Sequence, residues 1–259
     1  MSVVPGAAAL SLADHTAFVT GAAQGLGQAI ARGLAEAGAR VALADIDTDG
    51  VQSAAETLCR AGHEAIALPL DVRDEAGFNT ALAGALEHWN RVDVMVNNAA
   101  RSSSRPLWEI TGQEWDELLA VNLRGSFFGC RIAGQHMRER RQGGRIINLS
   151  SVAAQQASAA SGAHYAASKA GILALTRSFA AELAPDGVTV NAVAPSAIRG
   201  PALQELDDEQ RERLLAATPL ARIGEAYEVA AAVVFLAGAR AGYITGATLD
   251  INGGRLMRC

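Results

Sequence analysis

Short apolar runs alternate with longer stretches of helical periodicity along the chain. The runs are rich in β-branched residues and are bounded by glycine or polar residues, as is typical of buried strands. They predict strands over residues 16–21, 40–46, 65–72, 92–100, 144–151, 187–195 and 247–253. Apolar residues three and four positions apart predict helices over 26–38, 49–62, 74–90, 163–184 and 225–238, and a further helix that begins with Thr111.

Helices separate the successive strands, which favours right-handed crossovers and a parallel sheet covered by helices on both faces. The chain has no stretch rich in proline, serine and glycine that would divide it. We therefore predict an α/β fold of one domain over residues 1–259. Its core would be a doubly wound, parallel, seven-stranded sheet of the Rossmann type.

Residues 196–224 are the one irregular segment, and they carry the charged run ELDDEQRER. Such a run is usually a solvated helix face. Because the segment follows the carboxyl end of a strand, it also fits a mobile lid over a substrate cleft, and the two interpretations are compatible.

Two helix ends have recognisable signals. TGQE at 111–114 predicts a capping box, in which Thr111 and Glu114 satisfy each other's terminal amides. The basic run RERRQGGR at 138–145 falls at the end of a predicted helix, where cations suit the helix dipole, so we interpret it as a solvated helix end.

Composition excludes several classes of protein. The formal net charge is -5 and the chain has no dense block of Lys and Arg, so we expect no nucleic-acid partner. Cys59, Cys130 and Cys259 form no CxxC pair, which indicates free thiols in a reducing compartment. The five histidines show no pair at ligand spacing, and no apolar run approaches membrane-spanning length. We expect a cytoplasmic protein without a metal, a signal peptide or a membrane partner.

The sequence TGAAQGLGQA at 20–29 joins the first strand to the first helix. Gly21 would permit the tight turn, Gly25 would let backbone amides approach a phosphate, and Gly27 would let the helix pack closely on the sheet. Asp45 ends the second strand, where an acid is the expected partner of an adenosine ribose; the alternative is a helix cap. Together these residues predict a dinucleotide site.

The charge of Asp45 favours one dinucleotide over the other. A 2′-phosphate beside it would place like charges about 4 Å apart, which costs roughly 4 kcal/mol at an effective dielectric near 20, or about a thousandfold in affinity. Gln24 occupies the middle of the glycine turn, where an arginine could offset this repulsion, and Arg40 lies at the far end of the second strand. The predicted cofactor is NAD rather than NADP.

Tyr165 and Lys169 are four positions apart in HYAASKAG and share one face of a predicted helix. An ammonium some 4 Å from a phenol supplies roughly the 4 kcal/mol that moves the phenol pKa from about 10 to about 7. Tyr165 would then be a general acid/base; the alternative is a buried tyrosine beside a snorkelling lysine. Ser150 and Ser151 favour catalysis, because they end the fifth strand at the edge that faces the ligand crevice.

Nearly the whole chain resembles the short-chain dehydrogenase/reductase family, including its NAD-dependent secondary-alcohol dehydrogenases and 3-oxoacyl-[acyl carrier protein] reductases. Several independent motifs occur in the family's order, which makes the resemblance specific. They are TGAAQGLG, LAD with Asp45, LDV with Asp71, NNAA at 97–100, VNL with Asn122, NLSS, YAASK, VNAVAP and YITGATLDINGG.

The resemblance implies the roles of the residues nearest the reaction. Tyr165 would be the acid/base, and Lys169 would lower its pKa while holding the nicotinamide ribose. Ser151 would orient the substrate oxygen, with Ser150 as a weaker candidate. Asn122 would position a water in a proton relay through Lys169.

The resemblance also implies a cofactor site and an assembly. Asp71 would contact adenine, Asn98 would hold the backbone near the cofactor, and Val193 and Ile198 would lie at the nicotinamide end. Family members are commonly homotetramers that pair the helix beginning near Thr111, the helix that carries the tyrosine, and the last strand. The implied cofactor-binding residues are Gly21, Gln24, Gly25, Leu26, Gly27, Asp45, Ile46, Asp71, Val72, Asn98, Ala99, Ala100, Tyr165, Lys169, Pro195, Ser196 and Ile198.

The chain departs from the family pattern at a few positions. Ser151 lies 14 residues before Tyr165, one more than is usual, which indicates a small insertion in AAQQASAASGAH. Ala100 stands where glycine is common, and Gly200 replaces a threonine that often holds the carboxamide of the cofactor. Ser196 replaces a glycine, so it would be strained if that position needed a positive φ.

Polar side chains near the predicted site point to the substrate class. If they line the cleft, they favour a polar small-molecule substrate such as a polyol, a sugar or a hydroxy acid. Arg101 or Arg105 of RSSSR would then meet a carboxylate or phosphate; the alternative is that both are solvated. The polar residues before the tyrosine are Gln155, Gln156, Ser158, Ser161 and His164.

The leading hypothesis is an NAD-dependent oxidoreductase of a secondary alcohol or ketone. A 3-oxoacyl thioester reductase and a steroid or aryl-diol dehydrogenase are the alternatives within the family. A non-catalytic NAD-binding sensor and a sugar epimerase or dehydratase on a related fold are the alternatives outside it.

Overall fold

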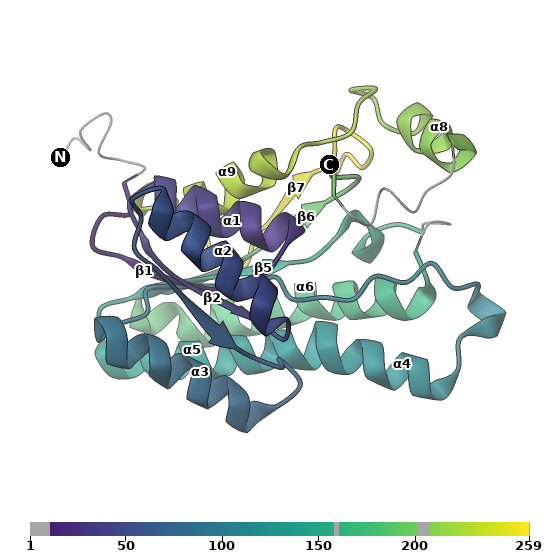
Figure 1. Ribbon diagram of the computed structural model, residues 1–259. Coiled ribbons are helices and arrows are strands. Elements are labelled where there is room, and N and C mark those ends of the chain that lie inside the picture. The colour runs from purple at the N-terminus through teal and green to yellow at the C-terminus, as the bar shows by residue number, and fades with distance from the viewer. Residues whose placement is uncertain (1–10, 158–160, 201–207, 259) are drawn as a thin grey trace.

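The computed structural model describes residues 11–157, 161–200 and 208–258, and its centre is a parallel sheet of seven strands (Figure 1). The strand order is β3-β2-β1-β4-β5-β6-β7, so the order reverses between β1 and β4. This confirms the predicted doubly wound α/β fold. The strands are β1 Thr16–Thr20, β2 Arg40–Asp45, β3 Ala65–Pro69, β4 Val94–Asn97, β5 Gly144–Leu149, β6 Val188–Pro195 and β7 Thr248–Ile251.

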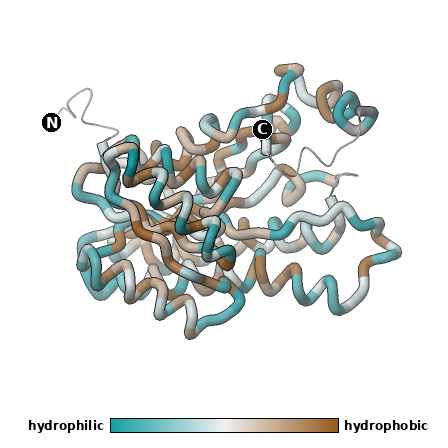
Figure 2. Tube along the Cα trace, in the orientation of Figure 1, coloured by the Kyte–Doolittle hydropathy of each residue, from teal (hydrophilic) through white to brown (hydrophobic). Residues whose placement is uncertain are grey.

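Helices cover both faces of the sheet (Figure 1). On one face lie α1 Gly25–Glu36, α2 Thr48–Arg60 and α9 Ala226–Ala237. On the other lie α3 Glu75–Trp89, α4 Gly112–Leu119, α5 Gly125–Arg140 and α6 Ala163–Leu183, and α8 Asp208–Ala216 lies apart from the sheet. Every residue of β1, β4 and β6 is buried, as expected for strands covered on both sides. The hydrophobic colour in Figure 2 accordingly follows the strands in the middle of the molecule.

The fourth strand is shorter than the predicted 92–100 because its neighbour ends the ladder. The hydroxyl Oγ1 of Thr20 accepts hydrogen bonds from the backbone amides of Asn98 and Ala99, at 3.0 and 3.1 Å. These amides are satisfied by a side chain instead of by a strand, so β4 ends at Asn97.

The helix that begins after Thr111 continues through a π turn, Ala120–Arg124, into α5. Thr111 caps it as predicted, since its Oγ1 accepts from the amide of Glu114 at 3.1 Å. The return half of the predicted capping box is wrong: the Glu114 carboxylate binds Arg105 instead. Among the described helices, the complete box belongs to α9, between Glu225 and Glu228.

The basic run at the end of α5 is only partly solvated. Arg138 and Arg141 are exposed as predicted, but Arg140 reaches the buried carboxylate of Asp93. Its Nη1 lies 2.6 Å from Oδ1 of Asp93, and Nη2 of Arg91 lies at the same distance. The interpretation as a solvated helix end is therefore wrong for Arg140, which fastens α5 to the start of β4.

Replacing Asp93 with asparagine should destabilise the fold by roughly 3 to 5 kcal/mol at neutral pH, because it leaves two arginines beside a lost charge. Burial opposes ionisation of Asp93, but hydrogen bonds from Arg91 and Thr16 and the charge of Arg140 lower its pKa below the ordinary 3.8. This stabilisation is therefore present above pH 3.8 and is lost as the pH falls through the lower folded-state value.

Urea unfolding at several pH values measures the effect, with Glu36→Gln, which breaks an exposed Arg32–Glu36 pair, as the control. The control should change stability by less than about 1 kcal/mol. The difference between wild type and Asp93→Asn should shrink in acid. An Asp93→Asn protein as stable as wild type at pH 7 would contradict the structural role of this cluster.

No helix within the described ranges is long and apolar enough to cross a membrane. The same ranges contain no group of three or more His, Cys, Asp or Glu side chains that could hold a metal ion. Cys59 is exposed, Cys130 is buried, and both are free thiols, while Cys259 lies outside the described residues.

Candidate active site

A cavity of about 790 Å³ lies at the carboxyl edge of the sheet. It spans the point where the strand order reverses, which is where doubly wound folds bind their ligands. All the predicted cofactor-binding residues line it, together with the predicted catalytic Ser151: Gly21, Gln24, Gly25, Leu26, Gly27, Asp45, Ile46, Asp71, Val72, Asn98, Ala99, Ala100, Tyr165, Lys169, Pro195, Ser196 and Ile198.

The glycine turn after β1 is shaped to receive a phosphate. Gly21 and Gly25 have φ values of +66° and +58°, which favour glycine. A Cβ on Gly27 would lie 2.0 Å from the carbonyl oxygen of Gly21, so only glycine allows the start of α1 to approach this turn. Gln24, at the N-cap of α1, makes no side-chain cap, which leaves the first amides of the helix for an anion. The turn therefore fits the pyrophosphate of a dinucleotide.

Asn98 connects the end of β4 to the glycine turn. Its Nδ2 donates to the carbonyl oxygens of Thr20 and Gly21, at 2.9 and 3.0 Å. The Asn98 side chain thus holds the backbone of the glycine turn, as the family resemblance implies.

Asp45 is part of the cavity wall and does not cap a helix. Its Oδ2 accepts from the amide of Ala23 and its Oδ1 from the amide of Asp47, both at 3.0 Å. The N-cap of α2 is Asp47, whose side chain accepts from Gly50, so the helix-cap alternative for Asp45 is wrong. The Asp45 carboxylate is partly exposed and lies beside the glycine turn, where an adenosine ribose would bind.

Asp71 is engaged by an arginine that the sequence interpretation missed. Arg73 makes three side-chain hydrogen bonds to Asp71, which hold the pKa of this carboxyl below its usual value. Both residues line the cavity. The guanidinium group of Arg73 is therefore already paired with the Asp71 carboxylate.

The predicted acid/base residues converge at the start of α6. Tyr165 is hydrogen bonded to Ser151, which follows β5. Lys169 is 3% exposed, and its Nζ lies 5.7 Å from the centre of the Tyr165 ring. The same Nζ donates to the carbonyl oxygen of Leu149 at 2.7 Å. The end of β5 and the residues just after it thus contact both Tyr165 and Lys169.

The pKa of Tyr165 does not shift in the predicted direction. Burial raises it, and the hydrogen bond with Ser151 opposes this rise. Burial also lowers the pKa of Lys169 to about 8. The prediction was wrong because it considered only the charge of Lys169, whereas removal from water disfavours the charged form of each residue.

Ser150 has a structural role, which separates it from Ser151. It is buried, and its hydroxyl donates to the backbone carbonyl of Lys169 at 2.9 Å. Leu149 at the end of β5 and Ser150 just after it therefore hold the ammonium and the backbone of Lys169. Of the two serines, Ser151 is the one that reaches the tyrosine.

Asn122 and Val193 lie behind the cavity and do not line it. Asn122 is fully buried in the π turn, where its side chain binds both the amide and the carbonyl of Arg101, at 2.8 and 3.0 Å, and also Ser168. Its own carbonyl accepts from Ser126. Val193 is packed in the hydrophobic core, so its implied place at the nicotinamide end is wrong.

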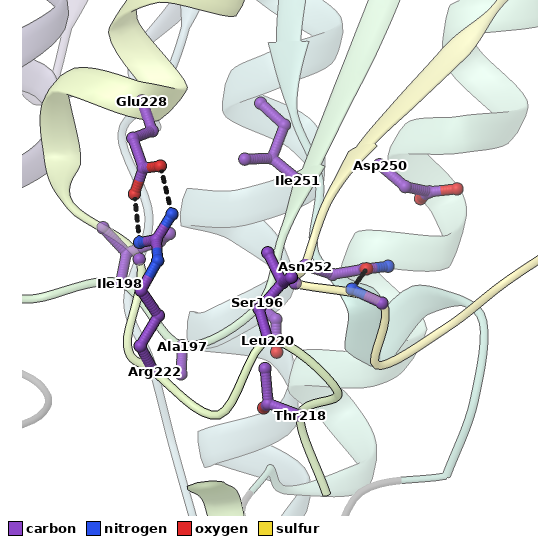
Figure 3. Close-up of a pocket in the computed structure, with 13 residues that line it drawn as sticks. Ser196, Ala197, Ile198, Thr218, Leu220, Arg222, Glu228, Asp250, Ile251 and Asn252 are labelled. Atoms are coloured by element: carbon purple, nitrogen blue, oxygen red, sulfur yellow. Dashed lines mark hydrogen bonds and ion pairs between the residues drawn. The ribbon is translucent and has the colours of Figure 1, made fainter.

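The family departures after β6 are tolerated without strain. A smaller cavity, of about 280 Å³, shares Ser196, Ala197 and Ile198 with the larger one, and its lining residues are drawn in Figure 3. Ser196 is not among the non-glycine residues with positive φ in the described ranges, so the expected strain is absent there. A Cβ on Gly200 would meet no atom of the described residues within 4 Å.

Few of the polar residues considered for the substrate reach the main cavity. Arg101 and Ser102 line it, whereas Arg105 pairs with Glu114. Of the residues before the tyrosine, Gln155 binds Asp250 at 2.7 Å, while Gln156, Ser161 and His164 are absent from the lining and Ser158 lies outside the described residues. The lining residues that sequence reasoning missed are Leu70, Arg73, Val121, Leu149 and Ala197, and each lies next to a motif or just after a strand.

Comparisons with known proteins identify the family of this chain. A family model described as enoyl-(acyl carrier protein) reductase matches residues 21–255. The chain is 39% identical over 248 residues to 3-oxoacyl-[acyl-carrier-protein] reductase FabG of Vibrio cholerae, covering 96% of this chain and 100% of that protein. It is 35% identical to sorbitol dehydrogenase of Cereibacter sphaeroides, with the same coverage. The structure of a short-chain type dehydrogenase/reductase from Mycobacterium marinum has a TM-score of 0.92 at 29% identity, covering 96% of this chain and 98% of that one. The chain belongs to the short-chain dehydrogenase/reductase family.

Proposed function

We propose that this protein is an NAD-dependent dehydrogenase or reductase that interconverts a polar secondary alcohol and the corresponding ketone. As a family member it is an oxidoreductase of CH–OH and keto groups that uses a nicotinamide cofactor. The observation that carries the proposal is that Ser151, Tyr165 and Lys169 line the same cavity as the glycine turn and Asp45.

Tyr165, Ser151 and Lys169 have different roles around the reacting carbon. A nicotinamide cofactor, when bound in this cavity, would supply the hydride chemistry. Tyr165 moves the proton at the substrate oxygen, and Ser151 orients that oxygen. Burial keeps Tyr165 protonated at neutral pH, which is the form that gives a proton to a ketone. The ammonium group of Lys169, held by the carbonyl of Leu149, lies in the wall of the same cavity as Tyr165.

The choice of NAD rests on the charges around the adenosine end. The Asp45 carboxylate would repel a 2′-phosphate, whereas it would accept hydrogen bonds from a ribose diol. Arg73, which lines the same cavity, is bound to Asp71 and is therefore not free to offset that repulsion. Arg40 binds the carbonyl of Asp14 at the opposite end of β2.

A polar substrate is supported by Arg101 and Ser102 in the cavity wall. The side chain of Arg101 is 59% exposed and lies 3.5 Å from Glu117, a loose pair that a carboxylate or phosphate could replace. A 3-oxoacyl thioester reductase is the second candidate, because the relative at 39% identity has that name.

The deciding experiment follows the absorbance of reduced nicotinamide with purified protein. The alcohols are polyols, sugars, hydroxy acids, steroids and hydroxyacyl thioesters, each tested with NAD and with NADP. We expect turnover of a polyol, sugar or hydroxy acid with NAD. Turnover of thioesters alone would support the second candidate, and NAD binding without turnover of any compound would support a sensor.

Three further features belong to the proposal. We propose a cytoplasmic homotetramer. Its assembly is supported by Tyr243, which is fully exposed, and by Leu249 on the edge strand β7, which is 39% exposed. Light scattering tests this assembly.

Residues 196–224 are proposed as a substrate lid, of which 201–207 lie outside the described residues. A bridge between Ile198 and Gly224 brings the two ends of this segment together.

A further inference from the structure

His164 is a buried polar residue that the catalytic proposal does not use. It is fully buried at the start of α6, immediately before Tyr165, and neither ring nitrogen has a hydrogen-bond partner in the described structure. Its Nε2 lies 3.6 Å from Oε1 of Glu114. Buried polar atoms without partners are rare in native proteins, so this one needs a physical reason.

A segment that is hydrogen bonded to Gly162, two residues before His164, forms part of the cavity wall. We call residues 101–106 the strap. Its first residue, Arg101, is bound through amide and carbonyl by Asn122 of the π turn. Its carbonyl at Ser103 accepts from the amide of Gly162, at 2.7 Å. Its Arg105 binds the Glu114 carboxylate of α4. The strap therefore connects the π turn, which carries Asn122, the start of α6, which carries Tyr165, and α4.

The His164 ring lies between Gly162, which the strap binds, and Glu114, which Arg105 of the strap binds. A Cβ on Gly162 would lie 2.6 Å from Cε1 and 2.8 Å from Nδ1 of the ring, so the glycine is what admits the imidazole. On the other side is Glu114, whose two oxygens lie 2.9 and 2.7 Å from Nε of Arg105. A shift of about 0.5 Å would bring Nε2 of His164 into hydrogen-bond range of the same carboxylate.

We propose that His164 is a positioning residue: with Glu114 and Arg105 it holds the strap against the start of α6. The strap supplies Arg101 and Ser102 to the cavity wall, and α6 supplies Tyr165. The distance between the substrate wall and the acid/base is therefore set by the approach of the His164 ring nitrogen to the Glu114 carboxylate. The inference rests on the proposed function for its kinetic consequence, and the cofactor side of the cavity should be unaffected.

Kinetics of His164→Phe, which keeps an aromatic ring but removes both nitrogens, test the proposal. We expect kcat/KM for the alcohol to fall roughly tenfold to a hundredfold, with the Kd for NAD unchanged. His164→Gln, which restores a donor near Nε2, should recover most of the activity. Arg105→Met should cause a similar loss, and the double variant should be no worse than about either single one, since the two residues act through one carboxylate. Arg32→Met, which breaks the exposed pair with Glu36, is the matched control.

Hydrogen exchange of the backbone amides provides a readout that does not need turnover. In His164→Phe and Arg105→Met, the amides of Arg101 and Gly162 should exchange faster than in the wild type. A folded His164→Phe protein with unchanged exchange and unchanged kcat/KM would overturn the proposal, and so would an equal loss of NAD affinity. If His164→Phe does not fold, Arg105→Met decides, because that side chain is 49% exposed. A wild type without turnover would refute the proposed function, while exchange would still decide the role of His164.

Discussion

Replacing Tyr165 with phenylalanine is expected to lower kcat by roughly a hundredfold to ten-thousandfold while NAD still binds. The substitution removes only the hydroxyl and its hydrogen bond with Ser151, and the ring beneath Lys169 remains. The proton at the substrate oxygen then has no carrier, whereas the glycine turn and Asp45 are untouched. Steady-state kinetics and NAD titration by fluorescence measure the two effects separately.

Tyr227→Phe is the matched control for this variant. Tyr227 lies on α9, is 70% exposed and does not line the main cavity. It should retain wild-type kcat. If Tyr165→Phe also retained it, the assignment of the acid/base would be wrong, and so would the catalytic interpretation of Ser151.

Replacing Asp45 with asparagine is expected to remove the preference for NAD. In the wild type, repulsion of a 2′-phosphate should favour NAD by about a thousandfold. The neutral amide oxygen can still accept from Ala23 or Asp47, but it carries no charge. The ratio of kcat/KM values for NAD and NADP should therefore fall to within roughly tenfold of unity.

Asp47→Asn is a close control, since Asp47 is adjacent in sequence, does not line the cavity, and asparagine remains a good N-cap for α2. It should leave the ratio of the two cofactors nearly unchanged. Wild-type turnover with NADP and none with NAD would overturn the cofactor proposal altogether.

The fold and most of the cavity wall were predictable because local signals and topology agree. A glycine turn after one strand, Asp45 at the end of the next and Ser151 after the fifth all lie at carboxyl ends. In a parallel sheet these ends lie along one edge. Residues far apart in sequence were therefore placed together by the alternation of strands and helices alone.

The errors concern contacts and burial, which no local pattern encodes. The Glu114 carboxylate does not complete the predicted capping box, because it pairs with Arg105 of the strap instead. Arg140 looked like a solvated helix end because Asp93 is distant in sequence. The pKa of Tyr165 was predicted from one neighbouring charge, but its direction is set by burial. Nothing in the sequence indicated that the Asn122 side chain holds the backbone of Arg101, and the role of Asn122 in a proton relay stays a prediction.

The two hydrogen bonds that Leu149 and Ser150 make to Lys169, at and just after the end of β5, have a thermodynamic consequence. The carbonyl of Leu149 holds the ammonium of Lys169, and the hydroxyl of Ser150 holds its backbone carbonyl, so rotation of that side chain is restricted before any ligand arrives. A preorganised cation loses little conformational entropy on association. Binding energy from the dinucleotide is then left for orienting the alcohol.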